Sequence, residues 1–149
     1  IVQQLQMSDT NNDLYVDYQL FIDSEDNVWI FTRGQNIGTF ILSKESGEII
    51  HLMPTNSGDG ISSNMVTSVS EDEQGYIWLA MGHGGINILD KELNIVSRIS
   101  SRNNDKYSLA QNSVSCLYRD NENIIWAGTY KEGISYHHKD LIPFHHYQN

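Results

Sequence analysis

Cysteine is almost missing from this 149-residue chain, which contains only Cys116. A single cysteine cannot form a disulfide within the chain, and it leaves the redox compartment undetermined. A lone cysteine in a stretch such as VSCLYRD is usually a small buried residue, so we expect Cys116 to lie in the core.

Basic residues and long apolar runs are also scarce. The chain has 9 Lys and Arg against 19 Asp and Glu, which gives a formal net charge of -10. This balance disfavours nucleic acid and anionic membrane surfaces as partners, because both are bound through Lys and Arg. No apolar run approaches the roughly 20 residues that span a bilayer, so we expect no membrane contact by this segment. Residues 1–12 lack the basic and apolar parts of a signal peptide and read as the interior of a longer chain.

Tryptophan recurs at a regular spacing. The intervals are 78 - 29 = 49 and 126 - 78 = 48 residues, and an Asp stands six residues before each Trp. Such a period predicts a structural repeat, in which these residues are architectural rather than catalytic. The repeated pairs are Asp23 and Trp29, Asp72 and Trp78, and Asp120 and Trp126.

Turn residues repeat with the same period. Asp26, Gly75 and Asn123 stand three residues before each Trp, and these are the residue types that best tolerate positive φ in a tight hairpin. The Asp at the head of the turn is expected to accept bonds from backbone N–H groups two or three residues further on. Gly85 and Gly133 follow the second and third Trp by seven residues, and Gly38 is their counterpart in the first unit.

Each unit contains four short runs rich in β-branched and aromatic residues, separated by turn residues. Four strands in about 48 residues are typical of a β-propeller blade. We therefore predict an all-β fold, a partial β-propeller of about three four-stranded antiparallel blades that forms a single unit over 1–149. The predicted parts are the end strand of a preceding blade and a linker (1–14), and blades at 15–55, 64–100 and 112–149.

The repeat resembles the two-component regulator propeller. The resemblance rests on an Asn two residues before a Val, an acidic pair, a Gly, the Trp and a Gly-Gly-Ile or similar strand, as in NMVTSVSEDEQGYIWLAMGHGGINILD from Asn64 to Asp90. The third copy matches from Asn112 to His137, and the first matches from Leu20 to Leu42 with a longer loop.

The resemblance implies a function. Such repeats occur in the periplasmic sensor region of hybrid two-component histidine kinases, which commonly sense oligosaccharides and regulate polysaccharide use. It therefore implies a non-enzymatic, periplasmic binding segment with an oligosaccharide ligand.

Two alternative functions stay open. One is a fragment of a propeller hydrolase or lyase, for which the Asp-box of sialidases is the nearest motif, although Gly75 here follows Asp72 by three residues rather than two. The other is a plain protein-interaction propeller.

Loops between second and third strands share one propeller face with the connections between blades, and ligands tend to bind on such a face. The candidate ligand-binding residues there are Arg33, His83, Tyr130 and Lys131, whose alternative role is that of ordinary solvated loop residues.

Histidines cluster near the C-terminus at His137, His138, His145 and His146, with Asp140 nearby. Neighbouring residues of a strand face opposite sides, so at most one His of each pair faces a given side, and a stable site needs about three or four ligands. We therefore predict no metal site, no cofactor and no catalytic residue.

Three blades do not close a propeller, since closed rings usually have four to eight. An open arc has two apolar flanks and unpaired edges. We expect these flanks to be covered by further propeller blades or by sister chains, for example in a two-chain ring of six blades.

Overall fold

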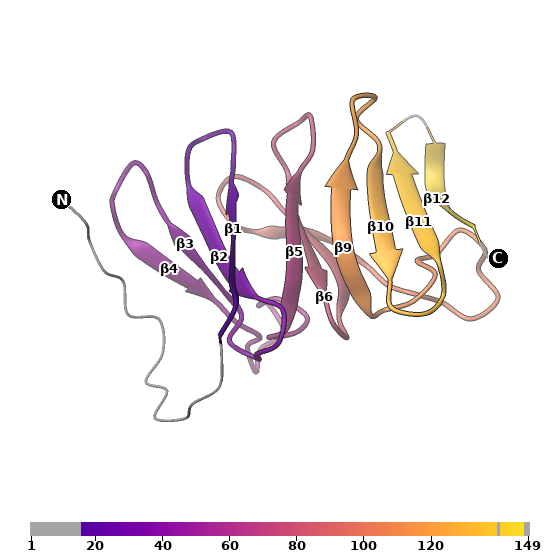
Figure 1. Cartoon of the computed structure of the whole chain (residues 1–149), viewed down its shortest axis with the longest axis horizontal. Helices are drawn as coiled ribbons and strands as arrows, with labels where there is room; N and C mark the ends of the chain where they lie inside the picture. Colours follow the sequence, from indigo (N-terminus) through magenta and orange to yellow (C-terminus); the bar gives the residue numbers. More distant parts are fainter. Residues whose placement is uncertain (1–15, 140, 148–149) are drawn as a thin grey trace.

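The computed structural model describes residues 16–139 and 141–147, and the side chains of 16–139. Twelve strands form three four-stranded sheets that stand side by side along the long axis of the molecule (Figure 1). The first sheet contains β1 (Tyr18–Ile22), β2 (Val28–Thr32), β3 (Thr39–Leu42) and β4 (Ile49–Leu52). The second contains β5 (Val66–Glu71), β6 (Ile77–Met81), β7 (Gly85–Leu89) and β8 (Ile95–Ile99). The third contains β9 (Val114–Arg119), β10 (Ile125–Thr129), β11 (Ile134–His138) and β12 (Leu141–Tyr147).

Each sheet is a simple meander in which every strand pairs antiparallel with the next one in the chain. No helix occurs in the part of the chain that the structure describes. The predicted fold class, an all-β partial propeller, is therefore confirmed. The strand predicted within residues 1–14 lies outside the described residues.

The hairpin between the first and second strands is built by the repeated Asp. The turn residues Asp26, Gly75 and Asn123 have φ values of 63°, 84° and 61°, as predicted. In the second sheet, Oδ1 of Asp72 accepts hydrogen bonds from the backbone N–H groups of Gln74 and Tyr76. These donors lie two and four residues after the Asp, rather than two and three, because the loop closes around the carboxylate. The same pair of bonds occurs at Asp23 and Asp120.

The repeated Asp and Trp are also joined directly, which the sequence analysis did not predict. The indole Nε1 of the Trp donates to Oδ2 of the Asp six residues earlier, at 2.8 Å in the first sheet, 3.0 Å in the second and 2.7 Å in the third. One carboxylate thus closes the turn with one oxygen and orients the indole ring with the other. The indole N–H has a partner although Trp29 and Trp78 are 1% and 2% exposed.

The core consists of two apolar clusters, one between each pair of adjacent sheets. Trp29 and Phe31 of β2 belong to the cluster that contains Val69 and Leu79 of the second sheet. Trp78 of β6 belongs to the next cluster, with Val114, Ile125 and Ala127 of the third sheet. Each of these two Trp side chains therefore packs toward the sheet that follows it, which is the architectural role expected of the repeated Trp.

A backbone hydrogen bond also joins adjacent sheets. Gly38 N donates to Asn64 O at 2.7 Å, and Gly85 N donates to Asn112 O at 2.9 Å. Gly85 has a φ of 70°, and a Cβ at this position would lie 2.2 Å from Ile99 O. Only glycine combines this backbone conformation with so close an approach of the fourth strand. The repeated Gly and Asn are thus the two partners of one connection between blades.

The prediction for Cys116 is wrong, since its side chain is exposed. Val114 and Leu117 of β9 pack against the second sheet. A register shift at Ser115 places Val114 and Leu117 on one side of β9, so Cys116 and Tyr118 face the other side, where the described residues include no further sheet. The register therefore exposes Cys116 despite its apolar surroundings in the sequence.

Candidate functional site

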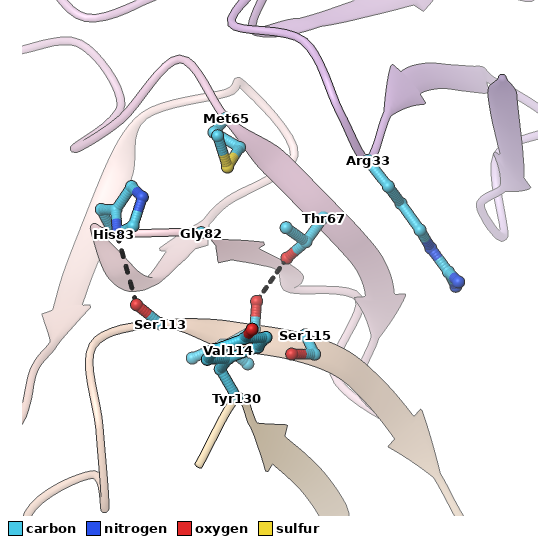
Figure 2. A pocket seen from close by; sticks show the side chains of 9 residues that line it. All are labelled: Arg33, Met65, Thr67, Gly82, His83, Ser113, Val114, Ser115 and Tyr130. Carbon is cyan, nitrogen blue, oxygen red and sulfur yellow. Dashed lines mark hydrogen bonds between the residues drawn. The ribbon is translucent and has the colours of Figure 1, made fainter. Parts of the chain in front are cut away.

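A cavity of about 410 Å³ lies where β5 and β9 begin (Figure 2). It is bordered by the segments that follow β2, β6 and β10, so all three sheets contribute to it. The residues that line it are Arg33, Met65, Thr67, Gly82, His83, Ser113, Val114, Ser115 and Tyr130.

Three of the four predicted ligand-binding residues meet at this cavity. Arg33 directly follows β2, His83 lies between β6 and β7, and Tyr130 directly follows β10. Lys131 does not line the cavity, and its Nζ lies 5.4 Å from the centroid of the Tyr130 ring. The structure thus brings together one side chain from each of the three sheets.

Backbone hydrogen bonds fix the two loops that carry His83 and Tyr130. Gly82 N donates to Met65 O at 2.9 Å, and Tyr130 N donates to Ser113 O at 2.9 Å. Met65 and Ser113 directly precede β5 and β9, so each loop is held against the start of the first strand of its own sheet. The side chains at the cavity mouth therefore project from anchored backbone.

The floor of the cavity is buried and its polar atoms are bonded. The Thr67 hydroxyl donates to Val114 O at 2.7 Å, and Val114 is 1% exposed. At Gly82 a Cβ would lie 2.2 Å from the Met65 Sδ, so glycine makes room there for the Met65 side chain. The floor thus presents Met65 and the Val114 backbone across the boundary between the second and third sheets.

The rim is exposed and polar. Tyr130 is 70% exposed, and Arg33 and His83 are exposed as well. The Ser113 hydroxyl and His83 Nδ1 are 3.3 Å apart and share a hydrogen bond that orients the imidazole ring. Figure 2 shows Arg33 and His83 on opposite sides of the cavity.

This arrangement suits binding. A serine nucleophile activated by histidine requires a third group that orients the second ring nitrogen. Within residues 16–139, no hydrogen bond or ion pair joins His83 to a carboxylate. The side chains at the rim can instead offer hydrogen bonds, a positive charge and an aromatic face to a bound molecule.

The described side chains do not form a metal-binding site. Among them, no group of three His, Cys, Asp or Glu residues could hold a metal ion. His137 and His138 lie on β11, whereas Asp140 and the side chains of His145 and His146 are outside the described part of the structure.

The sequence analysis missed the residues that form the floor and one wall of the cavity. Met65 and Ser113 occupy the middle position of the Asn-x-Val signature before β5 and β9. That signature could have identified them, because the connection between blades and the loop after the second strand share one propeller face. Thr67 and Ser115 follow two residues later, at the register shifts near the start of β5 and β9, and line the same cavity.

Comparisons with known proteins agree with this architecture. The family model of the two-component regulator propeller matches residues 60–83 and 108–131. Each match runs from the connection between blades to the loop that carries His83 or Tyr130. No curated protein matches the chain, and no helix among the described residues has the length and apolarity needed to cross a membrane.

Several solved structures have a similar fold. The extracellular domain of the putative hybrid two component system BT3049 from B. thetaiotaomicron is 21% identical, with a TM-score of 0.69, over 90% of this chain and 17% of that one. The corresponding domain of BT4673 from the same organism is 22% identical, with a TM-score of 0.66, over 89% of this chain and 16% of that one. PorZ, a surface component of the type-IX secretion system of Porphyromonas gingivalis, is 15% identical, with a TM-score of 0.60, over 83% of this chain and 20% of that one.

The matched segment makes up a fifth or less of each of these structures, and at such identities their likeness establishes the fold. The repeat pattern and the three sheets identify the chain as a partial β-propeller, in which residues 60–83 and 108–131 match the two-component regulator propeller repeat.

Proposed function

We propose that this chain is a ligand-binding segment of a periplasmic sensor propeller in a hybrid two-component signalling protein, and that it binds an oligosaccharide without catalysing a reaction. The observation that carries this proposal is the convergence of Arg33, His83 and Tyr130 from three successive sheets on one cavity. The family match and the fold of the two putative hybrid two component systems support the signalling role.

The chemistry of the cavity favours a sugar. Its volume of about 410 Å³ falls within the range that holds small molecules, and Tyr130 at its rim is 70% exposed. An exposed aromatic ring can stack on the apolar face of a pyranose. Ser113, Ser115 and His83 add hydrogen-bonding groups for sugar hydroxyls around this ring.

The same residues support the proposal of binding without turnover. Glycoside hydrolysis typically requires two carboxyl groups on either side of the scissile bond. The lining of the cavity includes neither Asp nor Glu among the described residues. The regular Asp residues are committed elsewhere, since Asp23, Asp72 and Asp120 each accept backbone and indole hydrogen bonds.

The test is binding of the 149-residue chain to a panel of defined oligosaccharides, measured by isothermal titration calorimetry. Tyr130→Ala is expected to weaken binding about tenfold or more, because it removes the aromatic platform. Tyr107→Ala is the matched control, since Tyr107 is 40% exposed, carries Lys106 4.8 Å from its ring centroid and lies away from the cavity.

The outcome separates the candidate functions. Binding that depends on Tyr130 and not on Tyr107 supports the sensor function. Release of cleaved sugar during the titration would replace it with the enzyme alternative. Absence of binding to every member of the panel, with capture of a protein partner, would replace it with the interaction propeller.

A further inference from the structure

The charge of the cavity is opposite to the charge of the chain. Acidic residues outnumber basic ones by 19 to 9 in the sequence. The cavity is lined by Arg33 and His83, and its described lining contains no carboxylate. Glu132 lies in the loop after Tyr130 but does not line the cavity, and its backbone N donates to the Thr129 hydroxyl. The described lining of the cavity therefore lacks the Asp and Glu side chains that are abundant in the rest of the chain.

Three cations of the described chain already have partners, whereas Arg33 does not. Lys91 pairs with Glu25 at 2.8 Å and Lys139 pairs with Glu73 at 2.5 Å. Arg98 donates to two backbone carbonyls, those of Gly58 and Gly60. Arg33, in contrast, has neither an ion pair nor a side-chain hydrogen bond to any residue of the described ranges. Its planar guanidinium therefore keeps its donors for a ligand.

We propose that the oligosaccharide bound here is anionic, and that Arg33 binds its carboxylate or sulfate group. This inference rests on the proposed sugar-binding function and assigns the class of sugar. A guanidinium pairs with planar or tetrahedral oxyanions through two parallel N–H···O bonds, which gives both strength and orientation. Uronates and sulfated sugars carry such groups, and a neutral sugar does not.

The remaining groups fit an extended ligand. Arg33 comes from the first sheet and His83 from the second, on the far side of the cavity, with Tyr130 from the third (Figure 2). A negative group at Arg33 places the following sugar ring over the cavity, where Tyr130 can stack on it. The Ser113 and His83 pair, with its 3.3 Å hydrogen bond, then faces the hydroxyls of the ring.

The net charge limits the length of this ligand. A formal charge of -10 repels a long polyanion over the surface outside the cavity. A short oligosaccharide places its negative group at the acid-free cavity and little charge elsewhere. The site therefore favours the short products of polysaccharide breakdown over the intact anionic polymer.

The experiment titrates the chain with four probes: a tetragalacturonate, its carboxyl-reduced neutral counterpart, a sulfated tetrasaccharide and its desulfated counterpart. At least one anionic probe is expected to bind about tenfold or more tightly than its neutral counterpart, because hydrogen bonds to charged groups are the stronger ones. Its affinity is expected to fall as salt is raised, since the contact is exposed.

Arg33→Gln removes the charge and keeps a polar side chain. It is expected to weaken binding of the anionic probe about tenfold and so to reduce the difference in affinity between this probe and its neutral counterpart. Arg102→Gln is the matched control, because Arg102 is an exposed arginine in a loop away from the cavity. Thermal unfolding of each variant confirms that the fold is retained.

The outcomes are distinct. Preference for the uronate or for the sulfated probe supports the inference and names the source of the charge. Equal binding of charged and neutral probes, or an Arg33→Gln variant that binds the anionic probe normally, overturns the inference and leaves the sugar-binding function standing. Absence of binding to all four probes and to the oligosaccharide panel overturns both the inference and the sugar-binding function.

Discussion

The second and third sheets carry the same repeat but differ in their surroundings. The second sheet lies between two others, and every residue of β6 is buried. In β10, the corresponding strand of the third sheet, only Ile125 and Ala127 are buried. Ser70 and Tyr118 both stand two residues before the repeated Asp, yet they are 6% and 64% exposed. Burial in this molecule is therefore set by the presence of a neighbouring sheet, as expected for a stack of repeats that contact only their neighbours.

Substitution of Trp78 and Trp126 tests most directly whether a neighbouring sheet sets the contribution of the repeated Trp to stability. Trp78 is 2% exposed in the cluster between the second and third sheets, whereas Trp126 is half-buried. Trp78→Ala is expected to lower the free energy of unfolding by about 3–5 kcal/mol. Trp126→Ala is expected to cost about 1–2 kcal/mol, since less apolar area is lost. Urea unfolding followed by circular dichroism measures both values.

Trp78→Phe provides a check in case Trp78→Ala does not fold. It retains most of the apolar volume and loses the indole bond to Asp72, so its cost is expected to fall between those of the two alanine variants. Equal costs for Trp78→Ala and Trp126→Ala would show that a neighbouring sheet does not set the contribution of the repeated Trp.

The exposed flanks provide the second test. Leu20 and Ile22 are 67% and 62% exposed on the first sheet, and Tyr118 and Ile134 are 64% and 47% exposed on the third. We expect copies of the chain to associate head to tail, because the flank of one copy then covers the opposite flank of another as adjacent sheets do within the chain. Light scattering after gel filtration is expected to give a multiple of 17.0 kDa that grows with concentration.

Leu20→Glu and Tyr118→Glu distinguish this geometry from a symmetric contact. Each variant alone is expected to be a monomer, since a head-to-tail contact uses both flanks. An equimolar mixture of the two variants retains one intact contact and is expected to form a dimer. A monomeric wild-type chain at every concentration would rule out association through the flanks.

The smallest expected effect concerns acid. The hydrogen bond from the Trp126 indole, followed by backbone bonds from Ile124 and Glu122, holds the pKa of Asp120 below its usual value. A lowered pKa in the folded chain means that the stabilisation is present above the ordinary Asp pKa of about 3.9 and is lost as the pH falls through the lowered value. Asp120→Asn is therefore expected to be less stable than wild type at pH 6, with a difference that shrinks in strong acid.

This difference is measured by urea unfolding of both proteins between about pH 6 and pH 2.5, the range in which an Asp titrates. A gap that stays constant over this range would mean that the Asp120→Asn variant loses stability through altered geometry of the turn rather than through loss of the carboxylate charge.

The repeat was predictable because its parts are local. Asp72, Gly75 and Trp78 interact within six residues of sequence, so their spacing alone indicated the turn and the strands. The positions of Arg33, His83 and Tyr130 were predictable as far as topology fixes them, since the segment after each second strand reaches the same face. The exposure of Cys116 was not predictable from the sequence, because the residues that would cover this side chain belong to another sheet.

The floor of the cavity was beyond the sequence analysis for a related reason. Thr67 and Val114 are 47 residues apart, and their hydrogen bond forms only because β5 and β9 lie against each other. Nothing in either local stretch distinguishes this Thr from one that faces solvent.

The loop that follows each second strand has a consequence for how such proteins diversify. Arg33 and Tyr130, from the first and third units, each lie four residues after the repeated Trp, and neither side chain makes a hydrogen bond to another sheet among the described residues. The links between sheets run through Gly38, Gly85 and the Trp side chains instead. Duplicated blades can therefore exchange loop side chains freely after duplication, so that a new binding preference arises by point substitution while the architecture is inherited intact.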